Sequence, residues 1–443
     1  MIWKKDKRAP CTADPDDSIY PPSTDESNPA RVTCLGRGWA RTSINAVIFR
    51  RDSLTSHLGM QYAAFYGPRG RVVLARRRLG EAAWETERTL HQGGTRDAHN
   101  CLSLMADGEG YLHLAWDAHD SPLRYCRGKE PGSLRLGPAT AMTGLREKRV
   151  TYPEFLRLAD GDLLFFYRHG ASGNGDLMLN RYHPASRTWS RVQEGLIDGQ
   201  GRRSAYHQAA LDERGVLHLS WVWRETPDVA SNHDLCYAQS PDGGRTWLRS
   251  DGSRYQLPIT AASAEYIRRI PQGRGLINQT SMAVDQRGDP CVATYWTPEG
   301  SEVPQYFLVH RRGGRWQTSQ VSRRSTPFSL SGLGTKSIPI SRPLLLLDRG
   351  QAGQTRCHMV FRDVERGHRV SLATCDNLDD PQWRFVDLTR EGVGAWEPTH
   401  DSVLWLQKGL LHLMVQKVGQ GDGEKLERLG PQPVWVLEWQ PPA

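Results

Sequence analysis

The chain has 443 residues, and its 15 Trp, 43 Gly and 27 Pro are typical of many short strands joined by tight turns. Lys and Arg outnumber Asp and Glu by 57 to 49, so electrostatics favour a polyanionic partner, either nucleic acid or acidic polysaccharide. No zinc-finger, helix-turn-helix or RNA-binding signature accompanies the basic residues, so we expect no nucleic-acid partner.

The eight cysteines are widely spaced and form no C-x-x-C pair, which favours reduced, packed thiols over a zinc or redox motif. The first residues, MIWKKDKRAP, carry charge but no apolar stretch, and no apolar run long enough to span a bilayer occurs. The sequence as given therefore predicts no membrane partner and no export signal. The location stays open between a cytoplasmic protein and a secreted one whose sequence has been trimmed.

One unit recurs along the chain: a short strand, a turn rich in Asp and Gly, an apolar strand, a polar loop and a further strand. The apolar strands are expected at 60–66, 111–116, 162–167, 216–221, 290–296, 357–361 and 410–415. Spacings near 50 residues suit four-stranded blades, so the sequence predicts an all-β fold, a seven-bladed β-propeller of four-stranded antiparallel blades. Two longer intervals leave room for inserted loops near 250–280 and 322–340, which we expect on the binding face.

Residues 1–30 are interpreted as a lead-in and residues 31–443 as a single propeller domain. Few residues follow the last expected strand, near 433–439, so a strand from residues 31–48 is predicted to close the ring. Residues 240–247, SPDGGRTW, match the S-x-D-x-G-x-T-W box of sialidase-type propellers. In that box Asp and Gly form a tight turn and Trp packs between blades, so it predicts structure and not catalysis.

Polar residues can be paired across each hairpin, because residues equidistant from the turn face each other at the open end. Three consecutive hairpins give the pairs His99–His119, Tyr152–Arg168 and Tyr206–Arg224. Equivalent ends of neighbouring blades point to the same side of the ring, so these six residues and His207 are predicted to line one sector of one face. Each residue alone is explained as well by a structural or surface role, and only their convergence indicates a site.

This set of side chains suits one reaction. Arg can neutralise a uronate carboxylate through a bidentate hydrogen bond, which acidifies the C5 proton. A neutral His can remove that proton, and a Tyr hydroxyl can protonate the departing glycosidic oxygen, which completes a β-elimination. The carboxylate pair of a glycoside hydrolase does not stand out. Acidic residues do occur at the same hairpin ends, and two of them, Asp97 and Asp117, are expected to orient the histidines or to solvate the rim.

At these motifs the sequence resembles the BNR-4 group of seven-bladed propellers, which includes the ulvan lyases of polysaccharide lyase families 24 and 25 and related rhamnose-glucuronate lyases. The matching segments are 94–100, 111–125, 152–155, 166–170, 217–224, 232–238 and 276–279. The resemblance implies that His99 and Tyr152 form the acid/base pair, in an undecided order, that Arg168 neutralises the uronate, and that His119 assists. The residues assigned to substrate binding are Tyr206, His207, Arg224 and Asn278.

The sequence therefore predicts a monomeric polysaccharide lyase that cleaves an acidic poly- or oligosaccharide, of the rhamnose-glucuronate type, by β-elimination. One alternative is a non-catalytic propeller that binds an acidic carbohydrate. Another is a sialidase-like glycoside hydrolase, which the box at 240–247 favours but for which no full set of arginines and acidic residues is found.

Metal binding is not expected at the site. Some ulvan lyases hold a structural zinc through Cys and His ligands shortly after the neutralising arginine, whereas residues 169–189 here contain no Cys. We therefore expect no zinc in that place and no cofactor, and a structural calcium ion stays open.

Overall fold

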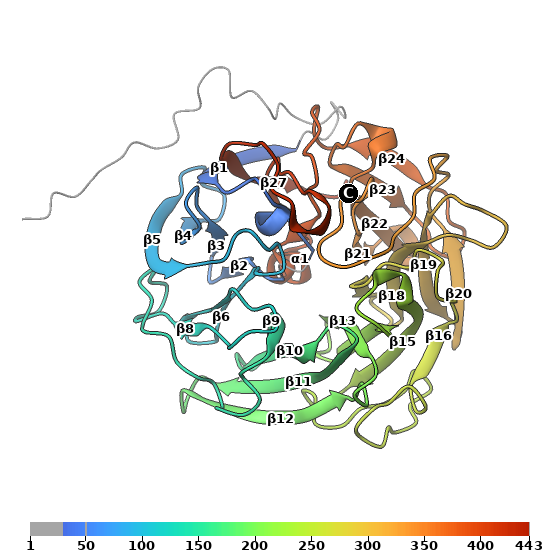
Figure 1. Ribbon diagram of the computed structural model, residues 1–443, viewed down its shortest axis with the longest axis horizontal. Helices are drawn as coiled ribbons and strands as arrows, with labels where there is room; N and C mark the ends of the chain where they lie inside the picture. The colour runs from blue at the N-terminus through green and yellow to red at the C-terminus, as the bar shows by residue number, and fades with distance from the viewer. Residues whose placement is uncertain (1–29, 49–50, 443) are drawn as a thin grey trace, which may run out of the picture.

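The computed structural model describes residues 30–48 and 51–442, so the expected lead-in over residues 1–30 lies, apart from Ala30, outside the described residues. The described chain is all-β, as predicted, with one α-helix, α1 (Ser402–Lys408). Groups of strands follow one another in chain order around a centre, near which α1 lies (Figure 1). No helix in this part of the chain is long and apolar enough to cross a membrane.

Most strands form four-stranded antiparallel sheets. One sheet contains β2 (Leu54–His57), β3 (Met60–Tyr66), β4 (Arg71–Arg78) and β5 (Glu85–Gln92). Another contains β17 (Ser281–Val284), β18 (Pro290–Trp296), β19 (Gln305–Arg312) and β20 (Arg315–Gln320). A third contains β21 (Leu344–Arg349), β22 (Thr355–Phe361), β23 (Ser371–Cys375) and β24 (Arg384–Asp387).

The sheet that contains the site is larger. One half is formed by β9 (Val150–Arg157), β10 (Leu163–Ala171), β11 (Asn174–His183) and β12 (Thr188–Ile197). The other half is formed by β13 (Ser204–Leu211), β14 (Leu217–Arg224), β15 (Asn232–Ser240) and β16 (Glu265–Arg268). The named strands of the two halves meet in a parallel contact between Gly175 and Ser204, and an isolated parallel bridge links Ile197 to Ile259. Within each half the strands pair antiparallel, so each half is a four-stranded antiparallel unit.

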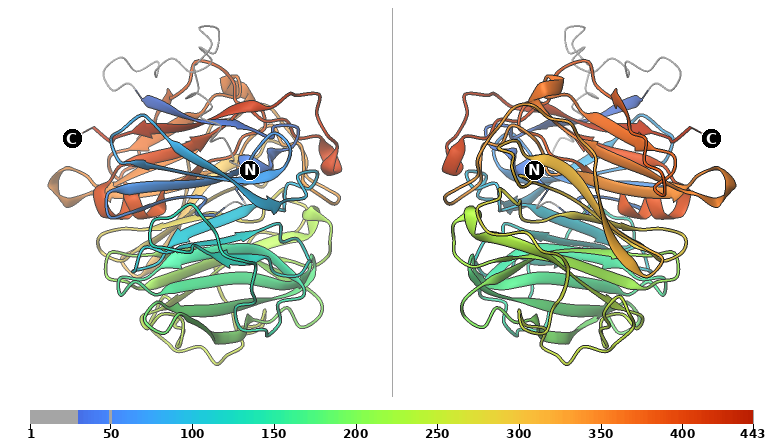
Figure 2. Two further views of the ribbon diagram at one scale, coloured as in Figure 1. Left: turned by 90° about the vertical axis from the view of Figure 1, so that its left-hand side faces the viewer. Right: turned by 90° about the vertical axis from the view of Figure 1, so that its right-hand side faces the viewer.

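The first and last described strands share a sheet. It contains β25 (Thr399–His400), β26 (Leu411–Val415), β27 (Gln432–Trp439) and β1 (Arg31–Gly38). β1 pairs antiparallel with β27, from Arg31 opposite Glu438 to Gly38 opposite Gln432. Figure 2 shows this N-terminal strand, in blue, beside the red C-terminal strands.

One sheet departs from the predicted four strands. It contains β6 (Leu102–Ala106), β7 (Leu112–Trp116) and β8 (Tyr125–Arg127). After β8 the described chain makes only an isolated bridge between Gly128 and Leu136. The following stretch holds several Gly and Pro residues, which disfavour a continuous ladder.

The box at 240–247 has the predicted structural role. The carboxylate of Asp242 accepts hydrogen bonds from the main-chain nitrogens of Arg245 and Thr246, which closes the turn. Trp247 is fully buried, and its indole nitrogen donates to the carbonyl of Gly244. Its ring belongs to a core cluster shared by the two halves of the largest sheet, so the box ties adjacent units together.

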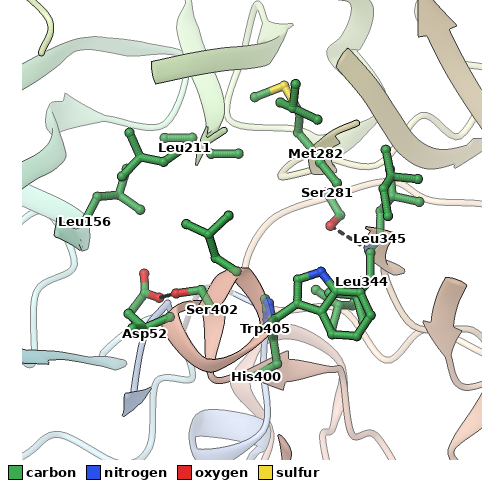
Figure 3. A pocket seen from close by; sticks show the side chains of 18 of the residues that line it. Asp52, Leu156, Leu211, Ser281, Met282, Leu344, Leu345, His400, Ser402 and Trp405 are labelled. Atoms are coloured by element: carbon green, nitrogen blue, oxygen red, sulfur yellow. Dashed lines mark hydrogen bonds between the residues drawn. The ribbon is translucent and has the colours of Figure 1, made fainter. Parts of the chain in front are cut away.

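A cavity of about 290 Å³ lies at the turn ends of the inner strands, away from the hairpin ends that carry the predicted site. Leucines such as Leu156, Leu211 and Leu344 form its walls, and Ser402 and Trp405 of α1 face it (Figure 3). The hydroxyl of Ser402 donates to Asp52 at 2.5 Å. Burial, together with the nearby charge of Glu154, raises the pKa of Asp52 to about 7.

Asp52 is expected to make stability depend on pH. An unfolded Asp titrates near pH 4, so folding stability is lost as the pH rises from about 4 through about 7, where the buried carboxyl must ionise. Asp52→Asn removes this loss and keeps an acceptor for Ser402, so its Tm should exceed that of the wild type at pH 8 and approach it near pH 4.

Differential scanning calorimetry across this pH range tests the expectation. Asp120→Asn is the control, because its carboxylate has a pKa that the hydrogen bond from Arg149 lowers, so its loss cannot raise the Tm at pH 8. A Tm difference for Asp52→Asn that does not change with pH would rule out the buried titration.

Candidate active site

The predicted site residues lie at the open ends of three neighbouring hairpins. His99 precedes β6 and His119 follows β7, Tyr152 and Arg168 lie in β9 and β10, and Tyr206 and Arg224 lie in β13 and β14. These strand ends lie opposite the tight turns, so all six residues lie at the same end of their hairpins. The structure brings them together through ring contacts and hydrogen bonds.

The two histidines form a stacked pair on one carboxylate. Their ring centroids lie 4.2 Å apart with an interplanar angle of 15°. The Nδ1 atom of His99 lies 2.8 Å from one oxygen of Asp97, and that of His119 lies 2.5 Å from the other. Asp97 thus orients both rings, as expected. Asp117 does not contact either ring in this way, because its carboxylate accepts from the main-chain nitrogen of Gly94 and pairs with Arg124.

The shared carboxylate separates the protonation states of the two rings. Burial alone would lower the pKa of His99, but the carboxylates of Asp97 and Glu424 raise it to about 8. For His119, burial and the charge on His99 lower the pKa, against the opposing effect of Asp97. Near neutral pH, His99 is therefore mainly an imidazolium and His119 a neutral imidazole.

Tyr152 reaches the site through a distortion of its strand. The register between β9 and β10 shifts between Phe166 and Arg168, and Arg168 stands opposite Thr151 rather than the predicted Tyr152. Tyr152 has a φ of 58°, in the left-handed region that bulky residues rarely occupy. This bulge re-aims the phenol ring, which lies 6.1 Å from the His99 ring and 5.0 Å from the Arg168 guanidinium carbon.

Tyr206 meets Arg224 in a register that differs from the predicted one. The tight turn closes with Asp212 accepting from the main-chain nitrogens of Arg214 and Val216, so its centre lies one residue earlier than expected. Arg224 therefore pairs with Ser204, and Tyr206 with Val222. The long Arg224 side chain still spans this offset, because one guanidinium nitrogen donates to the Tyr206 hydroxyl at 3.3 Å.

The two arginines are buried without a carboxylate partner among the described residues. Arg168 donates to the carbonyl of Gly170, and its Nη1 atom has no hydrogen-bond partner in the described structure. Arg224 donates to the main-chain oxygens of Thr226 and Pro227. By contrast, the buried Arg342 pairs with Glu397 at 2.6 Å. An uncompensated buried cation is unfavourable, so this place suits a ligand that brings a carboxylate.

The two tyrosines respond to these charges differently. Burial raises the pKa of Tyr152 well above its usual range, and the neighbouring Tyr206 adds to this effect. Burial would also raise the pKa of Tyr206, but Arg168 and Arg224, with the hydrogen bond to Ser172, together lower it. Tyr152 therefore keeps its proton at neutral pH and can donate it, whereas Tyr206 is a polar contact between two cations.

The other two predicted substrate-binding residues, His207 and Asn278, make contacts of their own. His207 packs against the Phe166 ring, with a centroid distance of 5.7 Å, and its Nε2 atom lies 3.3 Å from Glu154. The side-chain amide of Asn278 donates to Gln279 at 3.0 Å. Strand alternation explains the first case, because consecutive residues of β13 point to opposite sides.

Sequence reasoning missed two residues that contact His99. A carboxylate oxygen of Glu424 lies 3.3 Å from its Nδ1 atom, and the hydroxyl of Thr335 lies 3.2 Å from the same atom. Both residues lie more than 200 positions away in the sequence, Thr335 in an irregular segment and Glu424 in a short 3-10 turn, Asp422–Glu424. No local pattern marks them, and tertiary packing brings them to the histidine pair.

The histidine pair also has the composition of a metal site. Asp97, His99 and His119 each offer one ligand atom, and these atoms lie within 4.8 Å of one another. Two imidazoles and a carboxylate could hold a divalent transition metal. The Nδ1 atoms of both rings and the Asp97 carboxylate also form the hydrogen bonds described above, so a metal held by these atoms would displace those hydrogen bonds.

Replacing Glu424 should change the titration of His99. Glu424→Gln removes one of the two carboxylates that raise the pKa of His99, so that pKa should fall below about 8 while the hydrogen bond to Asp97 remains. Histidine-selective NMR over pH 5–10 measures this value. Glu427→Gln, on an exposed residue of the same segment, is the control, and an unchanged His99 titration in Glu424→Gln would contradict the assignment.

Comparisons with known proteins agree with this architecture. An ulvan lyase of Nonlabens ulvanivorans is 22% identical over 328 residues, which cover 64% of this chain and 67% of that protein. The ulvan lyase PL25 of Pseudoalteromonas sp. (strain PLSV) is 21% identical over 53% of this chain and 55% of its own length. A long-isoform ulvan lyase of the same strain is 45% identical over 121 residues, only 12% of that protein. The chain thus spans only part of each relative.

Solved structures show the same fold. The crystal structure of polysaccharide lyase Uly1 superposes with a TM-score of 0.66 at 17% identity, over 89% of this chain and 91% of that one. A PL25 ulvan lyase bound to -[GlcA(1-4)Rha3S]- gives a TM-score of 0.64 at 14% identity, over 87% and 96%. Residues 60–324, more than half of the sequence, match the BNR repeat-containing family. The chain resembles the ulvan lyases and belongs to the BNR repeat-containing family.

Proposed function

We propose that this protein is a polysaccharide lyase that cleaves a uronate-containing glycan by β-elimination. The observation that carries this proposal is the pair of buried guanidinium groups, Arg168 and Arg224, which lack a carboxylate partner in the described chain and lie beside a tyrosine and a histidine. A uronate supplies the missing charge, and its acidified C5–H bond supplies the proton to be transferred. The ulvan lyases among its relatives support the same reaction class.

In the proposed reaction, the uronate carboxylate binds at Arg168 and Arg224 and loses much of its negative charge, so the C5 proton becomes more acidic. His99 removes this proton in its neutral form. Asp97 holds the hydrogen on Nδ1, which leaves the lone pair on Nε2, across the ring from Asp97. The electron pair forms the C4–C5 double bond while the C4–O bond breaks.

Tyr152 donates its proton to the departing oxygen in this scheme. Its raised pKa keeps the hydroxyl protonated at neutral pH, whereas the pKa of His99, about 8, is the lower of the two. His119 shares Asp97 with His99 and helps to fix its ring. Tyr206 lies between the two arginines and binds the carboxylate with them. His207 and Asn278 stay predicted substrate-binding residues.

We further propose that residues 31–443 form one seven-bladed propeller, monomeric and closed by β1. Counting the two halves of the largest sheet separately, and β6–β8 as one unit, supports seven blades. For the substrate, a rhamnose-glucuronate glycan is the finer proposal, supported by the ulvan lyases among the relatives.

A carbohydrate-binding propeller without turnover is the second candidate. It is favoured by the pKa of His99, about 8, because an imidazolium beside two guanidinium groups binds an anion well but cannot accept a proton. Saturable binding of an acidic glycan with no unsaturated product at any pH would favour this candidate.

Loss of the Tyr152 hydroxyl should abolish turnover. Tyr152→Phe keeps the ring packing but removes the proton donor, so kcat should fall by about 100-fold or more, a typical contribution of general acid catalysis. The measurement is the ultraviolet absorbance of the unsaturated uronate, on ulvan, rhamnose-capped arabinogalactan and glucuronan. Tyr111→Phe, on a half-buried tyrosine outside the site, is the matched control. Full activity in Tyr152→Phe would contradict the assignment.

A further inference from the structure

An irregular segment between β20 and β21 crosses to two other parts of the ring. We call residues 332–337 the strap. At one end the main-chain nitrogen of Gly332 donates to the carboxylate of Asp228 at 2.7 Å, and the nitrogen of Val229 donates to the carbonyl of Gly332 at 3.1 Å. This end is therefore fixed to the loop that follows β14, the strand that ends in Arg224.

The other end of the strap is fixed to residues 422–424, which precede β27. Thr335 donates its main-chain nitrogen to Glu424 at 2.6 Å and accepts from the nitrogen of Gly423 at 3.1 Å. The ammonium of Lys336 pairs with Asp422 at 2.8 Å. At Gly334 an added Cβ would lie 3.2 Å from the Cα of Gly423, so the two backbones pack directly together. No sugar ring fits between them.

The strap lies beside the two parts of the proposed site, the histidine that takes the proton and the arginine that binds the carboxylate. Its Thr335 hydroxyl lies 3.2 Å from Nδ1 of His99, so the strap contacts the imidazole that transfers the proton, on the ring edge that also faces Asp97. Its Asp228 anchor belongs to the loop whose carbonyls, at Thr226 and Pro227, hold the guanidinium of Arg224 on the carboxylate side. The strap, which is anchored at both ends, thus runs from the loop that holds Arg224 to His99.

We infer that the strap closes one end of the cleft, so that the protein takes the end of an acidic glycan chain and not its interior. This inference rests on the proposed function. A uronate bound at Arg168 and Arg224 with its C5 near His99 has the strap on one flank, and a glycan that continued in that direction would collide with a hydrogen-bonded backbone. The substrate class is therefore uronate-bearing chain ends, including those of short oligosaccharides.

Product formation and chain length, followed together, test the inference. On a uronate polymer, absorbance should rise while viscosity falls slowly, and size-exclusion chromatography should show small products from the start. Early collapse of the viscosity at low absorbance would overturn the strap inference and leave the lyase proposal intact. Absence of any absorbance would instead contradict the lyase proposal.

A binding measurement on an inactive variant tests the strap inference without turnover. Calorimetric titration of the Tyr152→Phe protein with one uronate polymer, before and after ultrasonic fragmentation, compares equal masses that carry different numbers of chain ends. Saturation that follows the number of ends agrees with the strap inference, and saturation that follows uronate mass overturns it.

Releasing the strap should change the mode of action. Lys336→Ala removes the ion pair with Asp422, and Asp228→Ala removes the acceptor for Gly332, so the double variant loosens both ends of the strap and the ratio of viscosity loss to absorbance should rise several-fold. Arg146→Ala, which removes an exposed ion pair with Glu194, is the matched control and should keep the wild-type ratio. An unchanged ratio in the double variant, with the fold intact by circular dichroism, would contradict a blocking role.

Discussion

Burial of the Arg168 and Arg224 guanidinium groups, which form no ion pair with a carboxylate of the described residues, is the constraint on which the site depends. Main-chain carbonyls and the faces of two tyrosines accommodate the cations but do not neutralise them. The surrounding sheets must therefore hold these charges rigidly. β10 and β14 do so, because both arginines extend from paired strands and not from loops. The rigid scaffold makes the free charge a binding site for an anion.

Proton transfer depends on a carboxylate that two histidines share. One carboxylate, Asp97, holds two imidazoles, so the charge of one ring disfavours the charge of the other and the pair divides into a more basic His99 and a less basic His119. Glu424 adds to the basicity of His99 from the opposite end of the chain. The site thus combines distant parts of the chain, since residues 422–424, which precede β27, lie against His99 near the start of the described chain.

Much of this arrangement could be predicted from the sequence. Turn residues and alternating apolar strands fix the hairpins, and symmetry about each turn located the residues at the open ends. The finer register could not be predicted, because a bulge at Tyr152 and a turn centred one residue early at Asp212 depend on local backbone geometry. Thr335 and Glu424 could not be found either, since they lie in connecting segments between strands, whose place depends on tertiary packing.

The strap and the arginine pair belong to one functional arrangement. The loop that holds the Arg224 guanidinium through main-chain carbonyls also anchors Gly332, so carboxylate recognition and the closed flank of the cleft share a support. A protein built in this way recognises a charge and a chain end in the same place. The cavity that Ser402 and Trp405 of α1 help to line lies at the other ends of the inner strands and takes no part in this arrangement.

The role of the arginine pair can be measured by calorimetry with a glucuronate-terminated oligosaccharide and its carboxyl-reduced, glucose-terminated counterpart, on the Tyr152→Phe protein with and without Arg168→Met. We expect the carboxylate form to bind more tightly by about 10-fold or more, and Arg168→Met to remove most of this difference. Equal affinity for the two sugars, or a difference that survives in Arg168→Met, would show that the buried guanidinium groups do not recognise a uronate.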